Sequence, residues 1–177
     1  ILKQAKLFSV SLTEYLVSVY LYSLQSIYEQ QSKFKKRRSG KVLRVQVPVN
    51  LRKLFPSKTM RNFSLYVLPE IDLRLGHYTF EEIIKTVYYQ MRLETDKKLI
   101  SKIISRNVGG EKKALVRVLP LFLKSVFLTM LYKIATKQFS GVVTNLGKIE
   151  FDPLISSHIN KFTFIPPPPN NVLKTNC

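Results

Sequence analysis

Apolar side chains recur every three to four residues after Ser11, a spacing typical of an amphipathic helix. Ser11 and Glu14 match the S-x-x-E capping box, in which each side chain accepts a hydrogen bond from the backbone N–H of the other residue. We therefore expect a helix that begins at Ser11 and fades near Gln31. Its apolar face is formed by Leu12, Tyr15, Leu16, Val19, Tyr20 and Ile27.

A second helical pattern begins at Thr79, which forms the same kind of box with Glu82. Its apolar spacing continues to the Gly109-Gly110 pair, where we expect the helix to end, because glycine is common just past a helix C-terminus. Residues 111–135 are helical in pattern again. We expect a break near Pro120, whose ring disrupts a helix interior but suits the first turn of a new helix.

Four shorter segments predict β-strands, because they are rich in β-branched and aromatic residues. They are residues 42–49, 63–68, 140–145 and 161–165. Pro48 has no N–H to donate to a sheet, so we expect the first strand to be near its end there or to lie at an edge. A run of prolines follows the last strand and begins a proline-rich tail over residues 166–177.

This order of elements predicts one α/β domain over residues 1–177, in which helices cover one face of a mixed β-sheet. The 177 residues are 45% hydrophobic and 23% charged, which is the balance of a soluble globular protein with a real core. Since the chain begins at Ile1, we expect it to be part of a longer protein. Neither apolar segment suits a membrane span, because residues 15–28 are too few and charges interrupt residues 114–135, so we interpret both as core helices.

The net charge of +18 is the strongest compositional feature. It attracts polyanions such as nucleic acid, anionic lipid or a phosphate-bearing cofactor. Only KFKKRR, residues 33–38, is a dense run, which we interpret as part of an exposed basic loop over residues 32–40. The single cysteine, Cys177, excludes an internal disulfide framework and fits a reducing, cytoplasmic location.

Catalysis by this chain alone has little support. The two histidines, His77 and His158, lie far apart in sequence, and we interpret both as exposed turn residues. The chain has no G-x-S-x-G motif and no glycine-rich nucleotide-binding loop. With so few histidine and cysteine residues, we expect no metal site and no catalytic residue within the chain.

Three segments place polar residues at the ends of predicted strands, where α/β proteins commonly build binding sites. They are VPVNLRKLFP at 47–56, TMRNFSLYV at 59–67 and GVVTNLGKIEF at 141–151. Ordinary turn chemistry is the alternative interpretation, because asparagine and glycine favour turns. The candidate site residues are Asn50, Arg52, Arg61, Asn62, Thr144, Asn145 and Gly147.

Together these segments resemble the C-terminal lobe of the chloramphenicol-acetyltransferase-like superfamily, which includes condensation domains and alcohol acetyltransferase-like proteins. The resemblance rests on V-P-V-N-L-R at 47–52, R-N-F at 61–63 and T-N-L-G at 144–147, where Thr144 replaces the more usual serine. It extends from about residue 9 to residue 169. The family's H-H-x-x-x-D-G motif, which supplies the general base from the N-terminal lobe, does not occur in this chain.

The resemblance implies a two-lobed fold with a substrate tunnel between the lobes. The N-terminal lobe of the same protein would be the partner of this chain. The donor would be an acyl thioester of coenzyme A or of a carrier protein, and the acceptor an alcohol or an amine. We expect Asn145, Thr144 and Arg52 to line or brace the tunnel, and Asn50 and Asn62 to hold the strand ends by hydrogen bonds to backbone. A buried Arg52 would need a carboxylate or a carbonyl partner, with Glu70, Asp72 and Asp152 as the candidate carboxylates.

Other functions are compatible with the sequence. A non-catalytic scaffold or interaction domain is one, because a fold does not determine a function. A nucleic-acid-binding domain is another, supported by the charge and the nine tyrosines. A third is membrane contact through the helix at residues 12–28, although its polar face lacks the lysine and arginine residues of an interfacial helix.

Overall fold

The structure is a computed structural model that describes residues 1–34, 40–59, 62–112, 120–136, 140–145, 147, 154, 158–161 and 163. Its helices and strands, in chain order, are α1 (Leu2–Leu7), α2 (Leu12–Gln30), β1 (Val42–Asn50), the 3-10 turn η1 (Leu51–Lys53), β2 (Ser64–Val67), β3 (Glu70–Asp72), the 3-10 turn η2 (Leu73–Leu75), α4 (Phe80–Glu94), α5 (Lys97–Lys112), α7 (Leu121–Thr136) and β4 (Gly141–Val142).

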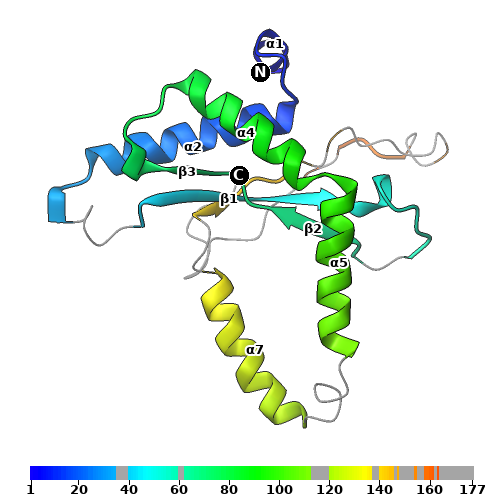
Figure 1. Cartoon of the computed structure of the whole chain (residues 1–177). Helices are drawn as coiled ribbons and strands as arrows, with labels where there is room; N and C mark the ends of the chain where they lie inside the picture. Colours follow the sequence, from blue (N-terminus) through cyan, green and yellow to red (C-terminus); the bar gives the residue numbers. More distant parts are fainter. Residues whose placement is uncertain are drawn as a thin grey trace.

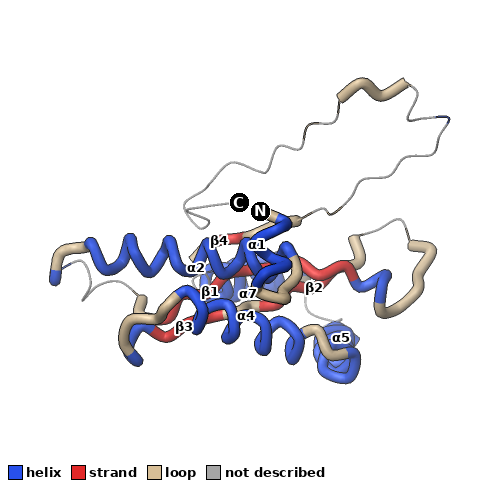
Figure 2. The backbone as a smooth tube through the Cα atoms, turned by 90° about the horizontal axis from the view of Figure 1, so that it is seen from above, coloured by secondary structure: helices blue, strands red, loops and turns tan. Residues whose placement is uncertain are grey.

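Helices α2 and α4 lie side by side on one face of a four-stranded mixed sheet, while α5 and α7 extend to the other side (Figures 1 and 2). The predicted α/β arrangement, a mixed sheet with helices on one face, is confirmed for α2 and α4. Both predicted capping boxes are present, at Ser11 with Glu14 and at Thr79 with Glu82. The hydrogen bonds of each capping box therefore determine where the helix begins.

The central strand is β1. Strands β2 and β3 pair with it antiparallel in one continuous register, with Val47 opposite Val67 and Arg44 opposite Glu70. They therefore lie in line along one edge of β1 and are separated only by Leu68 and Pro69. Strand β4 pairs in parallel along the other edge. Backbone hydrogen bonds agree with this arrangement, because odd-numbered residues of β1 bond to the β2–β3 line and even-numbered ones to the β4 segment.

The core lies between this sheet and the α2–α4 layer. Alternate side chains of a strand point to opposite faces, so one face of β1 is buried while the other is half-buried or exposed. The residues that meet in the core are Val17, Leu21, Leu43, Val45, Val47, Val67, Ile71, Ile83, Val87, Met91 and Val143. Helix α2 is thus a core helix, as predicted, but the predicted apolar face is wrong. Val19 and Ile27 of that face are exposed, and the buried side chains of the helix are Glu14, Val17, Ser18, Leu21 and Gln25.

Pro48 explains why the third predicted strand is short. It lies in the central strand, two residues from the end of β1, with its missing N–H on the side of β4. The parallel ladder bonds Val143 N to Gln46 O at 3.0 Å but has no donor at the next position. Strand β4 therefore covers only Gly141–Val142 instead of residues 140–145. The strand does end close to the proline, but it is not an edge strand.

The long second helix was predicted wrongly in two respects. It is interrupted after Glu94, because the Asp96 side chain caps a new helix by accepting hydrogen bonds from the N–H groups of Lys98 and Leu99 at 2.9 and 3.1 Å. The new helix, α5, then passes through Gly109 and Gly110 and ends at Lys112. A glycine in a helix interior costs about 1 kcal/mol relative to alanine, so two glycines disfavour a helix without preventing it.

Helix α7 begins directly after Pro120, as expected, but the interpretation of this segment as a core helix is wrong for its described side chains. Leu121 is 81% exposed and Val126 is 70% exposed. No helix among the described residues is long and apolar enough to cross a membrane. In the fourth predicted strand, the structure describes Lys161 and Thr163, and neither is in a strand. The other residues of that segment lie outside the described residues. The same holds for residues 35–39 of the basic loop and for the whole tail 166–177.

Candidate functional site

Six of the seven candidate residues lie at one end of the sheet. Parallel strands β1 and β4 both end there, and antiparallel β2 begins there. This end carries Asn50 and Arg52 after β1, Asn62 before β2, and Thr144, Asn145 and Gly147 after β4. Arg61 lies outside the described residues. Strand topology thus brings the segment after β4 together with the two segments at β1 and β2, which lie much earlier in the sequence.

After β1, two side chains organise the turn. The Asn50 Oδ1 atom accepts a hydrogen bond from the backbone N–H of Arg52 at 3.0 Å and so caps η1. The exposed Arg52 guanidinium donates to the Thr59 carbonyl at 2.9 Å, which closes the loop on itself. Arg52 is thus exposed and not buried, although its guanidinium does have a carbonyl partner.

The candidate carboxylates for Arg52 have other partners where they are described. Glu70 pairs with Arg44, and Asp72 pairs with Arg74. Asp152 lies outside the described residues. Hydrogen bonds from the Arg74 guanidinium hold the pKa of the Asp72 carboxyl at about 2, well below its ordinary value.

At the start of β2, the Asn62 Oδ1 atom accepts a hydrogen bond from the Ser64 hydroxyl at 2.8 Å. We expected Asn62 to bond to backbone, but this described bond joins two side chains. Both residues are exposed, so the contact orders the approach to β2 at the surface.

After β4, Asn145 connects two parts of the fold. Its Oδ1 atom accepts from the Gly147 N–H at 2.9 Å, and its Nδ2 group donates to the Thr13 hydroxyl at 3.1 Å. Gly147 has a φ of 72°, a left-handed conformation that glycine adopts without steric cost. The turn after β4 is therefore held against the first turn of α2.

The candidates divide between the two faces of the sheet. Val143 is buried in the core beside Val47, so the half-buried Thr144 faces the opposite side. Asn50 follows the exposed Pro48 by two residues and faces that side too. The bond from Asn145 to α2 turns this amide toward the helices. Asn50 and Thr144 therefore form a group on the open face of the sheet, which we call the open-face group. Asn145 lies on the helix side and holds the turn that carries Thr144.

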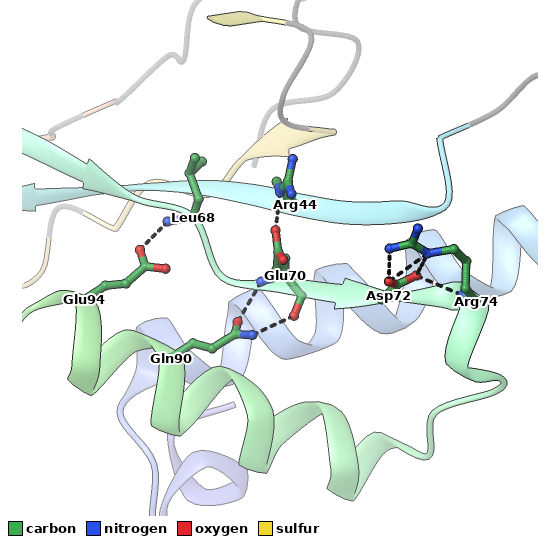
Figure 3. A network of polar contacts seen from close by, with 7 residues as sticks. All are labelled: Arg44, Leu68, Glu70, Asp72, Arg74, Gln90 and Glu94. Atoms are coloured by element: carbon green, nitrogen blue, oxygen red, sulfur yellow. Dashed lines mark hydrogen bonds and ion pairs between the residues drawn. The ribbon is translucent and has the colours of Figure 1, made fainter.

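A second polar cluster was not predicted from the sequence (Figure 3). The Gln90 amide accepts from the N–H of Glu70 at 2.7 Å and donates to the Glu70 carbonyl at 3.0 Å. Glu94 accepts from the N–H of Leu68 at 2.8 Å. Both side chains come from α4 and occupy the outer edge of the β2–β3 line. They satisfy backbone groups that would otherwise form an open sheet edge.

Neither histidine belongs to the strand-end group. His77 is exposed in the loop before α4, where its Nδ1 lies 2.7 Å from a carboxylate oxygen of Glu29. His158 lies in an exposed turn, as the sequence indicated. In the described part of the chain, no three histidine, cysteine or acidic residues are grouped so that they could hold a metal ion.

Comparison of the chain with protein-family models, with curated proteins and with solved structures found no match.

Proposed function

We propose that this chain forms one wall of the substrate cleft of a two-lobed acyltransferase. The observation that carries the proposal is the meeting of the three acetyltransferase-like segments at one end of the sheet. Helices α2 and α4 pack on the other face of this sheet, so neither of them covers the face that carries Asn50 and Thr144, and a second lobe would approach from the side toward which α5 and α7 extend. Strand ends next to an open sheet face are a common location for α/β binding sites.

The reaction would be direct acyl transfer. A histidine of the partner lobe removes the proton from an alcohol or amine, and the acceptor attacks the thioester carbonyl carbon. The new C–O or C–N bond forms, the C–S bond breaks, and the proton passes from the histidine to the leaving thiolate. The donor is an acyl thioester of coenzyme A or of a carrier protein.

In this scheme the chain supplies neutral and cationic donors, not the base. The Thr144 hydroxyl and the Arg52 guanidinium are the groups at this end that suit a developing oxyanion or a donor phosphate. Asn50 and Asn145 act as positioning residues, because each already bonds to a neighbouring turn or helix.

The test is thiol release from acyl-coenzyme A by the protein that contains both lobes, with alcohols and amines as acceptors. Thr144→Ala should lower kcat/KM about tenfold or more, by analogy with the loss of one oxyanion donor. Ser23→Ala removes an exposed hydroxyl from α2, on the opposite face of the sheet; it is the control and should retain activity. Equal activity of T144A and wild type would remove Thr144 from the site.

A protein that contains no H-H-x-x-x-D-G lobe and releases no thiol from any thioester would contradict the enzymatic proposal. That outcome would favour a scaffold of the same fold.

A further inference from the structure

Helix α7 exposes large apolar side chains on two opposite sides. The first stripe follows the spacing i, i+7, i+11 and is 57–81% exposed: Leu121, Leu128 and Tyr132. The second stripe follows i, i+3, i+7 and is 47–70% exposed: Leu123, Val126 and Met130. A surface helix normally has one apolar side, whereas a helix that is apolar all round is typical of a protein core or a lipid phase.

The neighbouring helix, α5, is strongly basic. It has five cationic residues and a single acidic one, Glu111: the cations are Lys97, Lys98, Lys102, Arg106 and Lys112. The first four of these are exposed. Both helices extend to the side of the sheet away from α2 and α4, so the apolar and the basic surfaces project together from the domain (Figure 1).

We propose that α7 docks into the surface of an anionic membrane, with α5 supplying cations for the lipid head groups. Lipid can surround a helix, so it can cover both stripes, whereas a flat protein face covers one. The chain's net charge of +18 opposes close approach of a second copy and favours an anionic surface. Nucleic acid would suit the cations but not the apolar side chains.

The length of α7 sets the depth of the contact. Its 16 residues extend about 24 Å, which is less than the roughly 30 Å hydrocarbon core of a bilayer. The helix therefore lies within one leaflet. Helices α5 and α7 extend to the side of the sheet that the proposed second lobe would approach (Figure 1), so the two proposals are tested by separate measurements: vesicle binding tests the lipid contact, and thiol release tests the acyl-transfer site.

The experiment is sedimentation of the whole chain with vesicles of phosphatidylcholine, with and without phosphatidylserine. Wild type should bind the phosphatidylserine vesicles, and less so as salt is raised. Val126→Glu and Leu128→Glu, one on each stripe, should each lower the partition coefficient about tenfold or more, since each removes a buried apolar contact.

Leu75→Glu is the matched control, because Leu75 is 79% exposed in η2 and the substitution changes the charge equally. This variant should bind like wild type. All three positions are exposed, and circular dichroism should show an unchanged fold. Equal loss in all three variants, no loss in V126E and L128E, or no vesicle binding by wild type would overturn the proposal. A dimer that V126E dissociates would also overturn it, in favour of a second copy.

Discussion

The Asn145 amide donates a hydrogen bond to the Thr13 hydroxyl at 3.1 Å and so joins residues that are 132 positions apart. The same amide accepts the Gly147 N–H on its other side. Asn145 therefore fixes the turn after β4 to the beginning of α2, next to the proposed substrate face.

This relationship gives a test of how Asn145 acts. Asn145→Ala should reduce acyl transfer by the two-lobed protein, because the turn that presents Thr144 loses both of its side-chain bonds. Thr13→Val removes only the bond to α2. If Asn145 is a positioning residue, T13V should also lower kcat, but by a smaller factor than N145A. If T13V has wild-type activity while N145A is inactive, the Asn145 amide would instead be in contact with substrate.

Gln90 should contribute to stability through the sheet edge. Gln90→Ala leaves the N–H and the C=O of Glu70 without their side-chain partner in a partly buried place. We expect the free energy of unfolding to fall by about 1–3 kcal/mol, measured by denaturant titration. Lys85→Ala, at an exposed position of the same helix, should change it by less than about 0.5 kcal/mol. Equal effects of the two substitutions would contradict the edge role.

Gly147 should tolerate asparagine better than alanine. Its φ of 72° disfavours an L-residue by about 1–2 kcal/mol, although a Cβ there would meet no described atom within 4 Å. Gly147→Ala should therefore destabilise the fold by about 1 kcal/mol, and Gly147→Asn by less. Gly40→Ala is the control, since Gly40 also has open space but no positive φ. Thermal unfolding of the three variants measures the difference.

The Asp72–Arg74 pair should make stability depend on acid pH. The Arg74 hydrogen bonds lower the pKa of Asp72 from 3.8 to about 2. The contribution of this pair to the free energy of unfolding is therefore present above pH 4 and is lost as the pH falls toward 2. Asp72→Asn keeps an oxygen that can cap the Arg74 N–H but removes the charge. The difference in unfolding midpoint between wild type and D72N should therefore shrink from pH 5 to pH 2. A constant difference would contradict this origin.

Local patterns were enough to predict the elements whose ends depend on nearby residues. The capping boxes at Ser11 and Thr79 set the starts of α2 and α4, and Pro120 marks the start of α7. Each depends on hydrogen bonds or ring sterics within four residues, so the sequence contains all the participants. The polar strand ends that form the candidate site were also visible, because turn-forming residues are recognisable one by one.

Only the tertiary structure decided how these elements combine. The continuous β2–β3 line, the shortening of β4 by Pro48 and the support of the sheet edge by Gln90 all depend on partners 14 or more residues away along the chain. The division of Asn50 and Asn145 between two faces depends on the same pairings. The exposure of α7 is likewise a tertiary property. The spacing of apolar residues shows which side chains favour burial, but not whether another element packs against them.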